Sequence, residues 1–139
     1  MNSTISFLGY SVRELNFSKN DYFKGGKINL DMKFTKNCTY LENNRVRINI
    51  SVKLFDNAEN DNYPFKLSFV TSGIFQYQDV NIEEDNSREL IEQKMLDILY
   101  PYIRMIVSNV LMVCNLPPLF LPTININQLV KDKESHSIN

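Results

Sequence analysis

Residues 100–122 read YPYIRMIVSNVLMVCNLPPLFLP, and this stretch decides much of the fold. Its first half is apolar at nearly every position. In its second half, Pro117, Pro118 and Pro122 remove backbone donors and fix φ, so this part runs extended and is neither a helix nor a central strand. The large apolar residues between these prolines either pack onto the protein's own core or stay available for another molecule to bury.

The apolar residues of the first half cover almost the whole circumference of a helix over residues 102–113. Such a helix is buried on more than one side. A small sheet covers only one of these sides, so we predict a homo-oligomer in which helices of different subunits pack together. The residues predicted at this interface are Tyr102, Ile103, Ile106, Val107, Val110, Leu111 and Val113.

Helical spacing also extends upstream of this stretch, beginning at Asn86. Asn86 followed by Glu89 resembles a capping box at a helix N-terminus. Pro101 is expected to break or kink this helix, or to start a new one. Beyond the prolines, a short helix is predicted to begin near Asn125 or Asn127.

The first half of the chain alternates apolar and polar residues, which predicts an antiparallel sheet covered on one face. The three regular strands are expected over residues 27–34, 45–54 and 65–77. In the first strand, the apolar phase changes between Val12 and Leu15, which predicts a β-bulge near Arg13. The predicted fold class is α+β: a four-stranded antiparallel sheet, a long interface helix, a proline-containing crossover loop and a short C-terminal helix.

The composition is that of one ordinary globular domain over residues 1–139, with flexible ends expected at 1–6 and 132–139. A net charge of −1 and a pI near 5.8 argue against a nucleic-acid partner. The apolar run at 105–114 is too short to span a membrane, and residues 1–10 lack the pattern of a signal peptide. We therefore expect a cytoplasmic protein without membrane insertion.

Residues that would form a catalytic or metal site do not come together in the sequence. Cys38 and Cys114 lie far apart, and His136 is the single histidine. A zinc site needs about four ligands, usually in close pairs. The acidic residues 83–85 fit a helix N-terminus, where the helix dipole favours negative charge. We expect no enzymatic activity, no metal and no cofactor.

With this order of elements, three motifs resemble the SecB family of bacterial protein-export chaperones. Residues 65–75, FKLSFVTSGIF, are similar to the fourth strand of the family, which ends in Gly-Ile-Phe. Residues 99–104, LYPYIR, resemble its helix segment with an aromatic-Pro-Tyr pattern. Residues 120–125, FLPTIN, are similar to its crossover loop. The likeness covers residues 7 to about 131 and is diffuse outside these motifs.

The resemblance implies a tetramer, built as a dimer of dimers with the long helices at the centre. It also implies an ATP-independent holdase, which keeps unfolded polypeptides, either preproteins or an antitoxin, on apolar grooves. By position, the client-binding residues would be Leu116, Pro118, Leu119, Phe120 and Leu121 in the loop, with Leu129 and Val130 in the second helix.

The sequence fits the family less well in the residues that would contact the SecA motor, to which family members deliver clients. The resemblance implies that SecA binds partly to an acidic surface of the sheet. Here the polar positions of the predicted strands hold mainly basic residues: Lys27, Lys33, Arg45, Arg47, Lys53 and Lys66, against Asp31. Glu14 is the one candidate SecA contact. Three functions stay open: an export chaperone, a specialised chaperone of a toxin–antitoxin system, and an oligomeric protein that binds a small apolar ligand.

Overall fold

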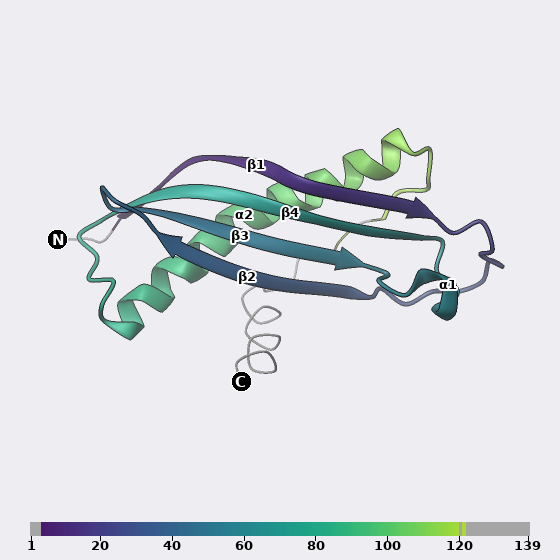
Figure 1. The fold of residues 1–139 in the computed structure, drawn as a ribbon, viewed down its shortest axis with the longest axis horizontal. Helices are drawn as coiled ribbons and strands as arrows, with labels where there is room; N and C mark the ends of the chain where they lie inside the picture. The colour runs from purple at the N-terminus through teal and green to yellow at the C-terminus, as the bar shows by residue number, and fades with distance from the viewer. Residues whose placement is uncertain (1–3, 120, 122–139) are drawn as a thin grey trace.

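The structure is a computed structural model that describes residues 4–119 and residue 121. Its elements are β1 (Thr4–Lys19), β2 (Met32–Tyr40), β3 (Arg45–Leu54), α1 (Ala58–Asp61), β4 (Phe65–Gln78) and α2 (Asp85–Val113). The strands form one antiparallel sheet in the order β1-β4-β3-β2, and α2 crosses it diagonally, from the β2 edge to the β1 edge (Figure 1). The predicted α+β class is confirmed. The predicted short C-terminal helix lies outside the described residues.

The two central strands, β3 and β4, follow the alternation in the sequence. In β3 the buried residues are Val46, Ile48, Ile50, Val52 and Leu54. β4 keeps one phase from Phe65 to Tyr77 and passes through Gly73 without interruption. A Cβ atom at Gly73 would lie 2.9 Å from Cδ1 of Leu99 in α2. The glycine therefore allows the helix to approach the sheet closely.

The edge strand β1 is longer than the sequence indicates. Its register shifts between Val12 and Glu14, so the predicted bulge is confirmed, and a second shift occurs between Phe7 and Gly9. Residues 4–6 were expected in a flexible end, but they pair with β4. The sequence does not predict strand at residues 4–6, because the second bulge, between Phe7 and Gly9, reverses the apolar phase again.

The other edge strand, β2, begins later and ends later than predicted. It starts at Met32, so residues 28–31 are not part of the strand, and it continues to Tyr40. β2 starts at Met32 because its single neighbour, β3, ends at Leu54, which lies opposite Met32. The alternating residues before Met32 therefore have no strand to pair with.

The helix α2 is continuous over Asp85–Val113, with Pro101 inside it. The expectation that Pro101 breaks or restarts the helix is therefore wrong. A proline in a helix removes one backbone hydrogen bond, and here the buried residues on both sides of it, Leu99 and Ile103, hold the helix on the sheet. The capping box predicted at Asn86 is not formed, because the helix begins earlier and its N-cap residue makes no side-chain capping bond.

The core lies between the sheet and the face of α2 that is turned toward it. By length and hydropathy α2 would pass for a membrane span, yet one side of it is packed against the strands. The predicted interface residues divide accordingly. Ile103, Ile106, Val107 and Leu111 are buried within the chain itself, so they do not have side-chain surface left for a partner. Tyr102 and Val110 are half-buried, and Val113 is 85% exposed.

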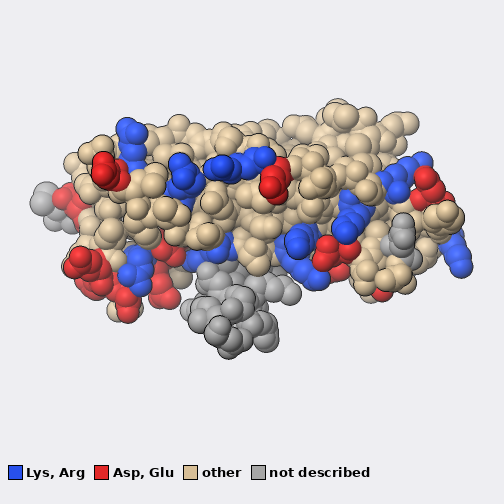
Figure 2. Space-filling view, in the orientation of Figure 1, with Lys and Arg blue, Asp and Glu red and all other residues tan. Residues whose placement is uncertain are grey.

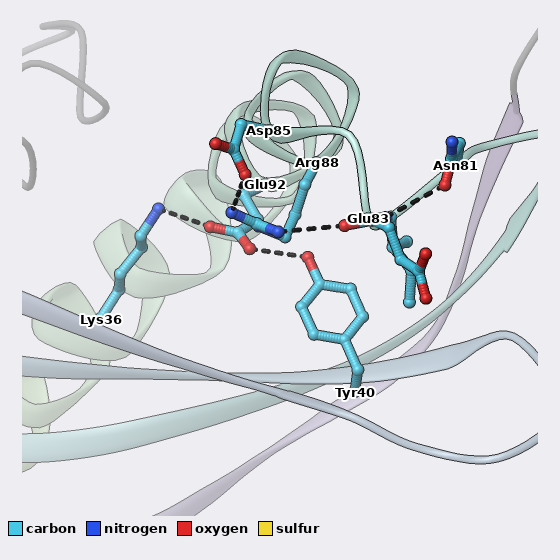
Figure 3. A network of polar contacts seen from close by, with 8 residues as sticks. Lys36, Tyr40, Asn81, Glu83, Asp85, Arg88 and Glu92 are labelled. Carbon is cyan, nitrogen blue, oxygen red and sulfur yellow. Dashed lines mark hydrogen bonds and ion pairs between the residues drawn. The ribbon is translucent and has the colours of Figure 1, made fainter.

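A polar network fastens the N-terminal half of α2 to β2 (Figure 3). Glu92 of α2 accepts a hydrogen bond of 2.6 Å from the Tyr40 hydroxyl and one of 2.9 Å from Lys36 Nζ. Burial, together with the bond to Glu92, raises the pKa of Tyr40 far above its usual range. The tyrosine therefore remains a hydrogen-bond donor at any physiological pH, and the helix is held at both ends of its crossing.

Candidate functional site

A cavity of about 530 Å³ opens at the end of the sheet where β1 ends and β4 begins. Its apolar lining consists of Phe23, Ile28, Phe55, Pro64, Phe65, Leu116, Pro117, Pro118 and Leu119, and its polar lining of Lys19, Asn20 and Asp21. We call this cavity the apolar groove, and residues 116–119 the proline loop. The groove brings together four segments that are far apart in the sequence.

The proline loop is directed into the groove by the way α2 ends. Asn115 has a φ of 57°, in the left-handed region. Its N–H donates to the Met112 carbonyl at 3.2 Å, and the N–H of Leu116 donates to the Leu111 carbonyl at 2.9 Å. These are the two hydrogen bonds of a Schellman motif. The motif reverses the chain at Asn115, after which the prolines keep it extended.

An aromatic cluster forms the floor of the groove. The ring centroid of Phe65 lies 5.7 Å from that of Phe17 and 5.1 Å from that of Phe55, and Phe55 lies 4.5 Å from Tyr63. Phe55 has a φ of 54°, which is rare for a large side chain and costs about 1–3 kcal/mol. Its aromatic neighbours Tyr63 and Phe65 pack against it in this conformation.

Asn20 joins the floor of the groove to its wall. Its Nδ2 donates to the carbonyl of Tyr63 at 2.8 Å and to that of Ala58 at 3.3 Å, while its Oδ1 accepts from the N–H of Tyr22 at 3.0 Å. Asn20 is itself buried. All of its hydrogen-bonding groups therefore serve the fold, although the residue lines the cavity.

Asn62, after α1, fixes the outer wall of the groove. Its Oδ1 accepts from the N–H of Lys24 at 2.9 Å, and its Nδ2 donates to the Gly25 carbonyl at 3.3 Å. These bonds tie the loop that follows β1 to the segment before β4. Phe23 and Ile28, which flank the tied loop, line the same cavity as the proline loop.

The client-binding residues predicted from the sequence fall into three groups. Leu116, Pro118 and Leu119 line the apolar groove; the leucines are half-buried and the proline is exposed. Leu121 is only 3% exposed and belongs to the core, so it is not an accessible contact. Phe120, Leu129 and Val130 lie outside the described residues.

Leu121 is buried because the chain returns to α2 after the proline loop. It lines a small cavity together with Pro101, Arg104, Met105 and Ser108, which lie on the helix. Leu121, which follows the proline loop, therefore packs beside Pro101 of the helix. This contact holds the far end of the proline loop against the helix.

Sequence reasoning missed the other walls of the groove. Phe23 and Ile28 stand in segments that the sequence marks as turn or strand, Phe65 begins a predicted strand, and Phe55 directly follows one. One signal was available: the clustering of Phe55, Tyr63 and Phe65 around a turn rich in Asn and Asp. That pattern does not reveal which other segments pack there.

The groove offers little chemistry beyond apolar contact. Over residues 4–119 and 121, no three of the His, Cys, Asp and Glu side chains lie close enough to hold a metal ion. Small-ligand sites combine an apolar pocket with a few convergent polar groups that orient the ligand. The buried polar residue of this groove, Asn20, already uses its side chain within the protein.

A sequence model of the family described as preprotein translocase subunit SecB matches residues 11–137 of the chain. The chain belongs to the SecB family. Similar proteins include the protein-export protein SecB of Neisseria meningitidis, 25% identical over 81% of this chain and 76% of the relative. SecB of Orientia tsutsugamushi is 27% identical over 89% and 79% of the two chains. An uncharacterised protein of Methanocaldococcus jannaschii is 28% identical over 94% and 84%.

A solved structure of a SecB-like chaperone from Mycobacterium tuberculosis has the same fold. It superposes with a TM-score of 0.65 at 18% sequence identity, over 86% of this chain and 87% of the other. That chaperone was solved in complex with a peptide from the HigA1 antitoxin. A Streptococcus agalactiae protein of unknown function superposes with a TM-score of 0.52 at 13% identity. The SecB-like fold predicted from the sequence is confirmed.

The predicted SecA contact, Glu14, lies on the sheet face that is turned away from α2. Glu14 is exposed and pairs across the sheet with Val70 of β4. The other charged strand residues of this face are mainly basic: Lys33, Arg45, Arg47, Lys53 and Lys66. Among the outward-facing positions of the described strands, Glu14 is the one acidic residue.

Proposed function

We propose that this SecB-family chain is an ATP-independent holdase that binds apolar side chains of non-native polypeptides in the apolar groove. The observation that carries the proposal is the half-exposure of Leu116 and Leu119 above an aromatic floor. Burying one large apolar side chain is worth about 1.5–3 kcal/mol. Such a site recognises hydrophobicity and not a particular sequence, as a holdase requires.

We further propose that the chain assembles as a homotetramer, a dimer of dimers. The burial of four predicted interface residues shifts the proposed interface to the apolar side chains that remain exposed. On the C-terminal half of α2 these are Met105, Met112 and Val113, with exposures of 41%, 71% and 85%. On β1 they are Tyr10, Val12 and Leu15. Tyr102 of α2 links the two elements, because its ring lies 4.7 Å from that of Tyr10 in β1.

Light scattering after size-exclusion chromatography tests the assembly. A tetramer has about four times the chain mass of 16.3 kDa. Val113→Glu should dissociate it, because an exposed apolar residue becomes a charge at the interface. A particle of one chain mass for the unaltered protein at micromolar concentration contradicts the proposed assembly.

Two classes of client fit a SecB-like holdase in the cytoplasm: preproteins on the way to export, and an antitoxin. The scarcity of acidic residues around Glu14 supports the second class, because SecA delivery needs an acidic surface. The antitoxin peptide bound to the M. tuberculosis chaperone gives it further support. We expect no binding to SecA at low salt, and tight SecA binding would restore the export role.

Binding of a small apolar ligand remains the weaker alternative. The cavity of about 530 Å³ has the size of a small-molecule site. However, its inner polar residue, Asn20, is occupied by bonds within the protein, so a ligand would lack an orienting partner.

An aggregation assay tests the holdase directly. The purified protein, at one tetramer per client, should suppress light scattering from a chemically denatured protein. The double variant Leu116→Ser/Leu119→Ser should lose most of this activity. Leu90→Ser is a matched control, because Leu90 is an equally apolar residue of α2 with 58% exposure, roughly 35 Å along the helix from the proline loop.

The two variants separate the possible outcomes. If the double variant remains folded and tetrameric but no longer suppresses aggregation, while Leu90→Ser remains active, the groove is the client site. If both variants suppress aggregation as well as the unaltered chain, clients bind elsewhere. If the unaltered chain itself does not suppress aggregation, the holdase proposal is overturned.

A further inference from the structure

The face of the sheet opposite α2, which we call the outer sheet face, carries a concentration of basic side chains. Buried side chains of β3 point to α2, so by alternation Arg45, Arg47 and Lys53 point away from it. The same alternation in β4 and β2 places Lys66 and Lys33 on this face. Figure 2 shows basic side chains spread along the strands with few acidic ones between them.

Among the described side chains, acids of the protein pair with only one of these charges. Lys33 lies directly opposite Lys53 in the β2–β3 register, a position in which like charges destabilise a sheet. Lys33 forms an ion pair of 3.6 Å with Asp56, and both side chains are partly exposed. Arg47 and Lys53 form no ion pair with any described residue. The chain as a whole has a net charge of −1, so this positive face is local.

The basic residues of β3 stand at the two ends of the face, and Glu14 of β1, opposite Val70, is the acidic side chain at its centre. Along β3, the side chains between Arg47 and Lys53 on this face are Asn49 and Ser51. Beside them on β4 lie half-buried Val70 and buried Ser72. Arg47 and Lys53 are six positions apart, which in a strand spans about 20 Å. Apart from Glu14, the neighbouring positions of β3 and β4 at the centre are uncharged, and few charges at the centre with a polar rim is the usual anatomy of a protein–protein interface.

We propose that the outer sheet face is a docking surface for an acidic protein partner, distinct from the unfolded client in the apolar groove. The partner would present aspartate or glutamate side chains toward the two basic ends. Exposed ion pairs contribute little affinity each, but complementary charge directs the encounter and excludes basic partners. Binding is therefore expected to weaken as salt is raised.

The composition of this face favours a protein over other acidic partners. Proteins that bind single-stranded nucleic acids stack the bases on aromatic side chains. The outer-facing positions of the four strands, over the residues the structure describes, hold no aromatic residue. Binding to a membrane surface uses apolar side chains that insert between lipids, and the two apolar outward-facing residues of β4, Val70 and Ile74, are half-buried among the strands.

Fluorescence anisotropy with labelled poly-L-glutamate, added to the full chain at low salt, tests the proposal. The variant Arg47→Glu/Lys53→Glu reverses two charges of the outer sheet face. The control Lys27→Glu/Lys94→Glu reverses two exposed charges elsewhere, on the loop before β2 and on α2. We expect the face variant to bind about tenfold more weakly and the control to bind like the unaltered chain.

Further measurements keep this proposal separate from the holdase. The face variant should suppress aggregation as well as the unaltered chain, because the outer sheet face lies on the other side of the sheet from α2. Equal weakening by the two variants shows a general charge effect and overturns the proposal. The proposal is also overturned if poly-L-glutamate does not bind, while phosphatidylserine vesicles or a single-stranded oligonucleotide bind the unaltered chain and not the face variant.

Discussion

The buried face of α2 and the proline loop follow each other in the sequence and are equally apolar, yet they have different surroundings. Leu99, Ile103 and Val107 are fully buried against the sheet. Leu116 and Leu119 are half-buried at the side of a cavity. A regular helix brings one side chain after another onto the same sheet, whereas an extended loop alternates its side chains and spans the gap beside it. The backbone, and not the side-chain chemistry, separates core from candidate binding surface.

Replacing Leu99 by alanine tests the core side of this comparison and has the largest expected effect. The variant should unfold with a free energy lowered by about 2–5 kcal/mol, because it leaves a cavity between α2 and β4. Chemical denaturation measures this loss. The folded fraction should suppress client aggregation normally. Leu90→Ala, at an exposed position of the same helix, should change the free energy of unfolding by less than about 0.5 kcal/mol.

Filling the space at Gly73, where α2 approaches the sheet closely, should have the second-largest effect on stability. Gly73→Val should lower the free energy of unfolding by about 1–3 kcal/mol, because its Cβ would lie 2.9 Å from Leu99 Cδ1. The double variant with Leu99→Ala should lose less than the sum of the two single losses, since the smaller residue makes room. Strictly additive losses would show that the two residues do not interact.

Asn115 lies at the boundary between the two regions. Asn115→Val should cost about 1–2 kcal/mol, because a β-branched residue does not tolerate the left-handed conformation observed there. Asn115→Gly should preserve or slightly raise stability, because glycine suits this position. We expect the valine variant, in an aggregation assay, to hold clients less well than the glycine variant. Equal activity would mean that the Schellman motif does not position the proline loop.

Tyr40 tests the polar attachment of α2 to β2. Tyr40→Phe should lower the free energy of unfolding by about 1 kcal/mol at pH 7, because Glu92 loses a hydrogen-bond donor. The raised pKa of Tyr40 means that the folded state keeps its proton when the unfolded state releases it, near pH 10. The contribution of this tyrosine to stability should therefore be constant below about pH 10 and should decrease above it. In denaturation curves measured at several pH values, the phenylalanine variant should decrease less steeply.

The same change as in the core, made in the proline loop, gives the smallest effect on stability. Leu119→Ala should lower the free energy of unfolding by less than about 1 kcal/mol, because its side chain is only half-buried. It should nevertheless reduce the suppression of client aggregation. If Leu119→Ala instead destabilises the protein as much as Leu99→Ala, the proline loop is part of the core and the groove is not a binding site.

Much of the fold could be predicted from the sequence because most of its strands are covered on one face. Alternation located β3 and β4 nearly to the residue, and a phase change located a bulge in β1. The limits of β2 could not be predicted, since they depend on where β3 ends. The continuous helix through Pro101 could not be predicted either, because the local rule for proline was outweighed by packing on both sides.

The candidate site was predicted only in part. The prolines identified the loop, and three of the proposed contacts line the groove. The exclusion of Leu121, and the inclusion of Phe23 and Phe55, follow from contacts between distant segments that no local pattern encodes. The side of α2 that faces the sheet was equally hidden, because a helix apolar nearly all round gives no preferred face.

The sequence by itself determined the α+β class, the alternating strands, the extended proline loop and the membership of the SecB family. These depend on local backbone preferences and on the periodicity of apolar residues, which a single chain displays directly. The tertiary structure alone decided which apolar residues are core and which line the groove. That choice depends on the crossing of α2 over the sheet and on the turn at Asn115, and both are set by packing between segments far apart in the chain.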